Sequence, residues 1–166
     1  MQAIKTIDLG NGYIASVYVD EYADYPWDRE DGHVDVEYFN RDVPRGYTTL
    51  RTHGRGYYAF NTRAAILKAS REGWSLDKNS REYARLGEKP SKSAIRWAAI
   101  EADARRMAEY LNGDWCYVGV SVHKGEDDFS HALWGIESDS DVIEVAQELL
   151  TQIEAEEQQR IAAVCC

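Results

Sequence analysis

The sequence predicts an α+β fold: an antiparallel sheet with about three helices packed on it, in a chain that ends strand, hairpin, strand, helix. Residues 115–123 form the strongest strand-like run, and a polar turn at 124–128 joins them to a returning run at 130–136. Two such runs joined by a short polar turn are typical of an antiparallel hairpin. Residues 91–111 and the residues after Asp141 place apolar side chains at spacings of three and four, which predicts two amphipathic helices.

The first half of the chain contributes shorter strands. Residues 13–19 are rich in β-branched and aromatic side chains and follow a turn-forming Gly-Asn-Gly sequence, which predicts a strand. Residues 34–39 alternate apolar and acidic side chains, as a half-buried strand does, and the extended residues 46–50 are expected to pair with them. The stretch 51–61 contains two glycines near its centre and is predicted to be a loop.

Two helices are predicted in the middle of the chain. The first begins at Thr62 and stops near Gly73. The second covers residues 91–111 and presents one apolar stripe to the sheet, made of Trp97, Ile100, Ala104, Met107, Ala108 and Leu111. On its other side, Glu101 and Arg105 are spaced for a favourable ion pair.

The final helix has a recognisable start. Asp141 stands three residues before Glu144, as in a capping box, with Asp in place of Ser or Thr. Its expected buried face is Val142, Val145, Ala146, Leu149, Leu150 and Ile153. Beyond Glu154 the apolar stripe is lost, so residues 155–166 are expected to be a frayed or exposed helical tail. We predict that residues 1–166 form a single domain, because this length suffices for one core.

Composition and cysteine content predict a cytoplasmic protein. Hydrophobic residues make up 44% of the chain, as in an ordinary globular protein, and no apolar run approaches the length needed to span a bilayer. The N-terminus lacks the pattern of a signal peptide. Cys116 lies in a predicted strand, and Cys165 and Cys166 end the chain, so the three do not make a disulfide framework. A reducing compartment fits this pattern.

The net charge of −10 is unevenly distributed along the sequence. Residues 20–42 hold nine acids and two arginines, residues 45–112 hold fourteen bases and seven acids, and residues 113–166 hold twelve acids and two bases. The chain is therefore acidic, then basic, then acidic. Either these charges pair across the folded surface, or the molecule presents a strongly negative face that suits a basic partner.

The sequence contains no motif that predicts a catalytic residue, a metal ligand set or a cofactor. His33, His53, His123 and His131 are not spaced with each other or with cysteine as zinc ligands are. Neither a serine-nucleophile motif nor a phosphate-binding glycine loop is present. An enzyme with an unfamiliar site stays open as an alternative, and it requires a pocket that gathers a histidine and a carboxylate around His53, His123 or His131.

The leading candidate for a partner-binding surface is the acidic–aromatic segment, residues 20–31, which is expected to be a loop. Its candidate residues are Asp20, Glu21, Tyr22, Asp24, Tyr25, Trp27, Asp28, Glu30 and Asp31. Carboxylates spaced like DNA phosphates can occupy a basic nucleic-acid channel, and exposed aromatic rings make interface anchors. Alternatively, the aromatic side chains pack into the core and the acids form a solvated loop.

A second candidate is the basic–aromatic segment, residues 45–63. Its candidate nucleic-acid-binding residues are Arg45, Arg51, His53, Arg55, Tyr57, Tyr58 and Arg63, with Tyr47 among them. Arginines interleaved with tyrosines around flexible glycines can hold phosphates while the rings stack on bases. Alternatively, these arginines pair with the acidic segments. A net charge of −10 also repels nucleic acid at long range.

The chain resembles a group of small acidic proteins of bacteriophages and mobile elements. The resemblance rests on the strand Asp114-Trp115-Cys116-Tyr117-Val118-Gly119, on the strand Leu133-Trp134-Gly135-Ile136-Glu137-Ser138-Asp139, on the closing helix, and more loosely on Trp27-Asp28. It implies a non-enzymatic protein that inhibits a host defence complex, in an anti-CRISPR or anti-restriction role by DNA mimicry, in the cytoplasm of an infected or element-carrying bacterial cell. The implied partner is a basic host protein or nucleoprotein complex, with nucleic acid as the partner only in the alternative and no membrane involved.

Overall fold

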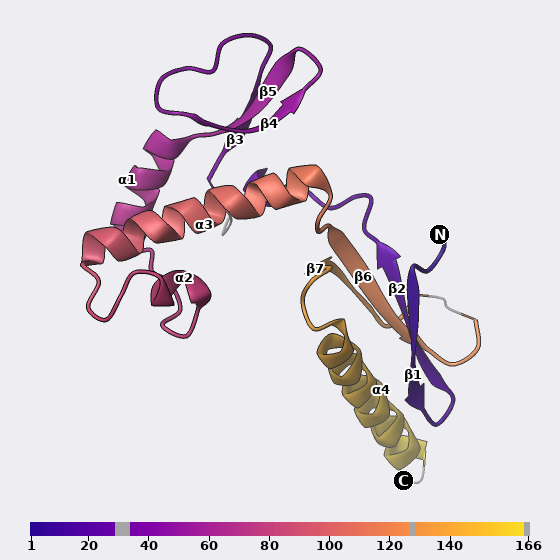
Figure 1. Ribbon diagram of the computed structural model, residues 1–166. Helices are drawn as coiled ribbons and strands as arrows, with labels where there is room; N and C mark the ends of the chain where they lie inside the picture. The colour runs from indigo at the N-terminus through magenta and orange to yellow at the C-terminus, as the bar shows by residue number, and fades with distance from the viewer. Residues whose placement is uncertain (29–33, 127–128, 165–166) are drawn as a thin grey trace. The chain divides into compact units, whose positions relative to one another are not determined.

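The computed structural model describes residues 1–28, 34–126 and 129–164, which form two compact units (Figure 1). Unit 1 combines residues 1–23 with residues 115–166, and unit 2 is the continuous stretch 24–114. Unit 2 is therefore inserted between two strands of unit 1. The expectation of a single domain stays a prediction, and the two units are described separately below.

Unit 1 is a four-stranded antiparallel sheet with one long helix. Its strands are β1 (Lys5–Gly10), β2 (Tyr13–Val19), β6 (Tyr117–His123) and β7 (Ala132–Glu137), in the spatial order β1-β2-β6-β7, and its helix is α4 (Val142–Val164). The two central strands are distant in sequence, yet they pair in continuous register from Ile14 opposite His123 to Val19 opposite Val118. The predicted ending of strand, hairpin, strand and helix is confirmed as β6, β7 and α4.

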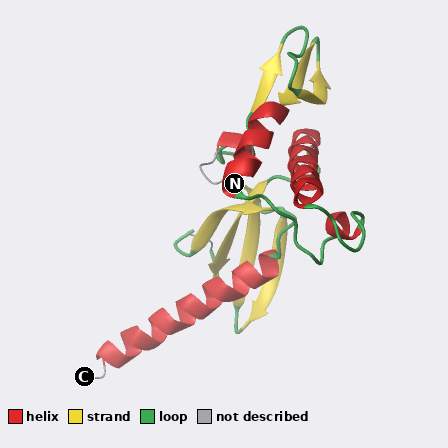
Figure 2. Cartoon of the chain, turned by 90° about the vertical axis from the view of Figure 1, so that its left-hand side faces the viewer, coloured by secondary structure: helices red, strands yellow, loops and turns green. Residues whose placement is uncertain are grey.

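The core of unit 1 lies between α4 and one face of this sheet. Alternate residues of β2 and β6 point to that face, as the two-residue period of a strand requires. The buried cluster consists of Tyr13, Ala15, Val17, Val118, Val120, Val122, Val142, Ala146 and Ile153. Cys116 packs against this cluster and is half-buried. The predicted helix stripe is thus confirmed as the buried face of α4, while residues 155–163 continue the same helix and are exposed (Figure 2).

The opposite face of the sheet carries an aromatic cluster. Tyr18, Phe129 and Trp134 lie with ring centroids 5.2 to 6.4 Å apart. The Trp134 ring lies directly on Gly119 of β6, where a Cβ atom would come within 2.2 Å of it. The pairing of β6 with β7 shifts register between Val118 and Val120, so the glycine and the tryptophan meet at a bulge.

Unit 2 contains a three-stranded antiparallel sheet and three helices. The strands are β3 (Val36–Phe39), β4 (Thr48–His53) and β5 (Gly56–Phe60), with β5 in the centre. The helices are α1 (Thr62–Glu72), α2 (Arg81–Ala84) and α3 (Lys92–Asn112), and a short 3-10 helix, η1, covers Pro26–Asp28. The α+β class with antiparallel strands is confirmed, although the strands divide between two sheets and the described helices include the short α2.

The prediction of a loop over residues 51–61 is wrong. Most of this stretch belongs to β4 and β5, which form a hairpin around Gly54 and Arg55. Gly54 has a φ of +61°, the left-handed conformation that a tight turn needs and that glycine adopts without strain. Gly56 lies under the ring of Tyr38, where a Cβ atom would approach the Tyr38 hydroxyl within 2.3 Å. The two glycines therefore shape a hairpin instead of interrupting it.

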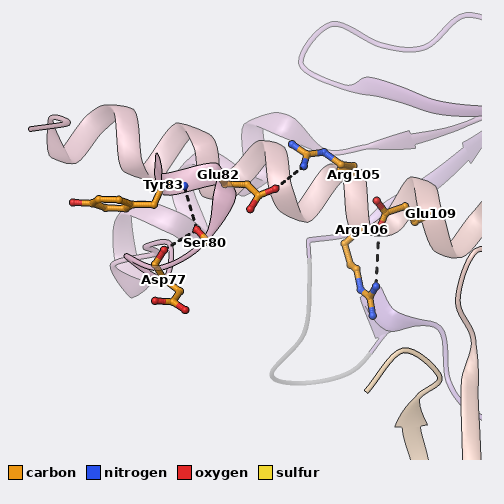
Figure 3. Close-up of polar contacts among 7 residues, drawn as sticks. All are labelled: Asp77, Ser80, Glu82, Tyr83, Arg105, Arg106 and Glu109. Atoms are coloured by element: carbon orange, nitrogen blue, oxygen red, sulfur yellow. Dashed lines mark hydrogen bonds and ion pairs between the residues drawn. The ribbon is translucent and has the colours of Figure 1, made fainter. Parts of the chain in front are cut away.

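The predicted ion pair between Glu101 and Arg105 is also wrong. The guanidinium of Arg105 lies 3.0 Å from the Glu82 carboxylate, which connects α3 to α2 (Figure 3). Glu101 accepts a hydrogen bond from the indole of Trp97 at 2.8 Å. Trp97 itself is 46% exposed and does not join the buried stripe, which is built around Ile100 and Met107. Arg105 therefore pairs with Glu82 of α2 and not with Glu101 on its own helix.

Helix α4 starts at a well-formed cap, which supports one stability prediction. The Asp141 carboxylate accepts hydrogen bonds from the backbone N–H groups of Ile143 and Glu144 at 3.1 and 3.2 Å. We expect Asp141→Ala to lower the free energy of unfolding by about 1 kcal/mol, since it leaves these donors without a side-chain acceptor. Urea denaturation measures the loss, with Gln152→Ala on the exposed side of the same helix as control. An unchanged midpoint for Asp141→Ala would contradict the assigned cap.

Among the helices of the described residues, none is both long enough and apolar enough to cross a membrane.

Candidate binding surfaces

The first part of the acidic–aromatic segment belongs to unit 1. The Asp20 carboxylate accepts hydrogen bonds from the backbone N–H groups of Tyr22 at 3.2 Å and Gly135 at 3.1 Å. Asp20 therefore links the end of β2 to the bulged part of β7, which is a structural role. Glu21 is exposed, and Tyr22 is 87% exposed, so these two side chains are presented to solvent.

The second part of the segment belongs to unit 2. Tyr25 and Trp27 stack with ring centroids 4.9 Å apart and an interplanar angle of 3°, and the edge of Tyr110 from α3 approaches both rings. Tyr25 remains 55% exposed, whereas Trp27 is half-buried. Asp24 and Asp28, which flank these two rings in sequence, are exposed. The candidates Glu30 and Asp31 lie outside the described residues.

The negative charge of the chain is concentrated in unit 1. Unit 1 contains fourteen aspartates and glutamates against three lysines and arginines, a net charge of −11. Unit 2 contains fifteen acids and sixteen bases, a net charge of +1, and together they account for the −10 of the chain. At least eleven carboxylates of unit 1 thus have no lysine or arginine in the same unit with which to pair.

Helix α4 carries several of the acids of unit 1 at exposed positions. Glu144, Glu148, Glu154, Glu156 and Glu157 are all exposed, and Arg160 is the single lysine or arginine of α4. Arg160 lies 3.8 Å from Glu156, and His131 lies 3.5 Å from the same carboxylate. A long row of carboxylates on one helix gives unit 1 a negative potential that attracts basic partners over a distance.

The basic–aromatic segment is built into the sheet of unit 2. Arg51, His53 and Tyr58 lie on one face of the β4–β5 hairpin, with Arg51 directly opposite Tyr58 in the register. Tyr57 lies on the other face, opposite Thr52. The arginines Arg45, Arg51, Arg55 and Arg63 are exposed, and none of them makes an ion pair with another described residue. The alternative in which these arginines pair with the acidic segments finds no support among those residues.

Sequence reasoning missed Tyr38, which completes this face from β3. Tyr38 is opposite Tyr58 in the register, and its ring centroid lies 5.1 Å from that of Tyr58 and 6.5 Å from that of His53. The Tyr38 hydroxyl donates to the carbonyl oxygen of His53 at 3.2 Å, across the small surface of Gly56. We call Tyr38, Arg51, His53, Gly56 and Tyr58 the tyrosine face. It lies near the β4–β5 turn, at the end of β5 opposite the one that leads into α1.

The other face of this sheet is fixed by a polar network. The Tyr47 hydroxyl donates to the Glu37 carboxylate and accepts from the side-chain amide of Asn61. Asn61 also caps α1, since its side-chain oxygen accepts from the N–H of Ala64. The hydrogen bond to Glu37 raises the pKa of Tyr47 above its ordinary value. The network gives Tyr47 and Glu37 a structural role, because it connects β3 to the residues just before β4 and just after β5.

A pocket in unit 1 lies beside the β6–β7 hairpin and α4, with a volume of about 170 Å³. His123, His131, Lys124 and Glu157 line it among other residues. The Tyr13 hydroxyl donates to Glu157 at 2.9 Å, and the Lys124 ammonium lies 3.9 Å from the Tyr13 ring centroid. Hydrogen bonding to Tyr13, and then the nearby carboxylates, raise the pKa of Lys124.

His123 is held from both sides of its ring. Its Nε2 lies 3.0 Å from the Ser16 hydroxyl and its Nδ1 lies 2.8 Å from the carbonyl oxygen of Gly125. Ser16 is 4% exposed, so the pair bridges β2 and β6 inside the sheet. The pocket gathers the histidines and carboxylates that the enzyme alternative requires. Its His123 bonds Ser16 and Gly125, and its Glu157 accepts from Tyr13, which connects α4 to β2. Across the described residues, no group of three or more His, Cys, Asp or Glu side chains is placed to hold a metal ion.

Comparison with known proteins adds no relative: no family model matches the chain, and no curated protein or solved structure is significantly similar to it.

Proposed function

We propose that this chain is a non-enzymatic binding protein of the bacteriophage or mobile-element type. It docks on a basic host protein and thereby inhibits a nucleic-acid-handling defence complex. The observation that carries the proposal is the net charge of −11 on unit 1, in which three lysines and arginines accompany fourteen carboxylates. A surface with so many uncompensated carboxylates attracts a basic groove as DNA does.

The acidic–aromatic segment supplies the contact side chains in this proposal. In unit 1, Tyr22 is an exposed ring next in sequence to the exposed acid Glu21. In unit 2, Tyr25 is an exposed ring, and Asp24 and Asp28 are exposed acids close to it in sequence. Rings of this kind are enriched among the residues that dominate binding energy at interfaces, while peripheral charges mainly speed the encounter. The resemblance to small acidic phage proteins supports a host defence complex as the target.

The test starts with capture from a bacterial lysate and continues with a defined complex. The tagged chain is incubated with nuclease-treated lysate at low and high salt, and the captured protein is then purified for binding measurements. We expect a basic protein that is lost at high salt and that short duplex DNA displaces. If the captured protein stayed bound at high salt, or if duplex DNA did not displace it, the proposal that an acidic surface docks on it would be overturned.

Three double variants, each of which removes two negative charges, test which acids contact the partner. Asp24→Asn/Asp28→Asn changes the segment, Glu148→Gln/Glu154→Gln changes α4, and Asp42→Asn/Glu88→Gln is the control at exposed acids elsewhere in unit 2. We expect the segment variant to weaken the complex by about two- to thirtyfold, as the loss of two exposed ion pairs implies. The α4 variant should chiefly slow association. Equal effects of all three would show that total charge alone matters and would contradict the assigned face.

A further inference from the structure

We propose that the tyrosine face of unit 2 binds single-stranded nucleic acid, with bases stacked on its rings and phosphates held by its arginines. This activity is separate from the docking of a basic protein, because it uses other side chains, those of the β3-β5-β4 sheet, and the opposite charge. The proposal rests on three features of the β3-β5-β4 sheet: the placement of its rings, the exposed and unpaired arginines, and the glycine that lets the rings lie on the backbone.

The rings form a small platform on the exposed end of the sheet. Tyr38, Tyr58 and His53 come from three adjacent strands, and their centroids are 5.1, 6.0 and 6.5 Å apart. Tyr38 is 44% exposed, His53 is exposed and Tyr58 is half-exposed. Aromatic rings presented on a sheet are a recurring way of stacking unpaired bases, and they accept any base because each has a π face.

Cationic side chains flank the platform, where they can contact the phosphates of a bound strand. Arg51 lies beside Tyr58 in the same row of the sheet, and Arg55 lies at the hairpin turn. Both are exposed and neither forms an ion pair with another described residue. Residues 36–60 contain four arginines and two acids, a local charge of +2 within an acidic chain. The acid nearest in the sheet, Glu37, lies on the other face and is bonded to Tyr47.

Gly56 makes the platform possible. Because it has no side chain, the Tyr38 ring lies across it and reaches the backbone of β4. A Cβ atom at this position would meet both the Tyr38 ring and the carbonyl oxygen of Phe39, at 2.3 to 2.7 Å. The Tyr38 ring is thus held against the sheet backbone while 44% of the residue stays exposed, and a base can stack on its exposed part. A duplex hides its base faces, so the occupant is a single strand.

Fluorescence anisotropy of labelled oligonucleotides tests the proposal on the full chain. The arms are an oligouridine RNA, the matching oligothymidine DNA and a duplex of that DNA, each titrated over a range of salt concentrations. We expect the single strands to bind more tightly than the duplex, with an affinity that falls as salt rises. The RNA and DNA arms identify which single strand is preferred. Failure of both single strands to bind at low salt, or tighter binding of the duplex, would overturn the proposal.

Paired variants assign the binding to the face. Arg51→Gln/Arg55→Gln should reduce the slope of log affinity against log salt by about 1.4, the contribution of two phosphate contacts on a single strand. Lys78→Gln/Lys89→Gln removes the same charge from exposed positions outside the sheet and should leave the slope unchanged. Tyr58→Ala should weaken binding on the order of tenfold, as the loss of one stacked base implies. If both charge variants gave the same slope of log affinity against log salt, the assignment of binding to the tyrosine face would be overturned. This comparison is between two variants that bind, so it does not depend on a variant that fails to fold.

The same experiment distinguishes this inference from the proposed function. Glu148→Gln/Glu154→Gln should weaken docking on a basic protein, yet it should leave nucleic-acid binding unchanged or strengthen it, because the chain becomes less negative. Loss of nucleic-acid binding in this variant would place the binding in unit 1 and overturn the inference.

Discussion

Replacing Phe60 by alanine is expected to lower the free energy of unfolding by about 3–5 kcal/mol. Phe60 is 1% exposed and is one of the largest fully buried side chains of the protein. It lies in the central strand β5, between Val36 of β3 and Thr48 of β4, so its removal leaves a cavity that the short sheet cannot close. Urea denaturation followed by circular dichroism measures the loss.

The matched control for Phe60 is Leu67→Ala. Leu67 belongs to α1 in the same unit and is 67% exposed, so its truncation should change the free energy of unfolding by no more than about 0.5 kcal/mol. A loss below about 1 kcal/mol for Phe60→Ala would contradict the assigned core of unit 2.

Adding a methyl group to Gly119 is expected to have the second-largest effect. The Gly119→Ala side chain would lie 2.2 Å from the Trp134 ring, closer than carbon atoms can approach. Trp134 must then leave its place beside Tyr18 and Phe129, or β6 and β7 must separate. Overpacking of this kind costs about 1–3 kcal/mol, which urea denaturation resolves.

A double-mutant cycle provides the control for Gly119. In the Trp134→Ala background the clash is absent, so the added methyl group should cost much less than in the wild-type chain. We expect a coupling free energy of about 0.5–3 kcal/mol between the two sites. Strictly additive losses would mean that Gly119→Ala acts on the strand backbone and not through the tryptophan.

Sequence patterns predicted the elements whose signals are local. The closing β6, β7 and α4 were predictable because two strong apolar runs surround a polar turn and a helix cap follows. The hairpin of β4 and β5 was not, because Gly54 and Gly56 give the same local signal in a loop and in a tight hairpin. In the structure Gly56 packs under Tyr38, which lies on another strand and is not part of the local signal.

The parts that escaped prediction depend on contacts between distant residues. The separation into two units follows from the pairing of β2 with β6, which no local pattern encodes. Strand β1 was not predicted, because its six residues contain only two apolar side chains that face the core, Ile7 and Leu9, and this is a weak strand signal. The candidate surfaces were predictable only in part for the same reason. Arg51, His53 and Tyr58 come from one sequence segment, but Tyr38 contacts Tyr58 from another strand. Similarly, Tyr110 of α3 contacts Trp27 of the acidic–aromatic segment.

The insertion of unit 2 into unit 1 has a consequence for the order of folding during synthesis. All strand partners and helices of unit 2 are encoded within residues 24–114, so it can fold as soon as this stretch has left the ribosome. Strand β2 waits for β6, which means closing a loop of roughly one hundred residues if the insert is unfolded. A folded insert brings the two ends of that loop into a defined relation before β6 arrives. The acidic unit is thus completed last, after the part of the chain that carries the tyrosine face.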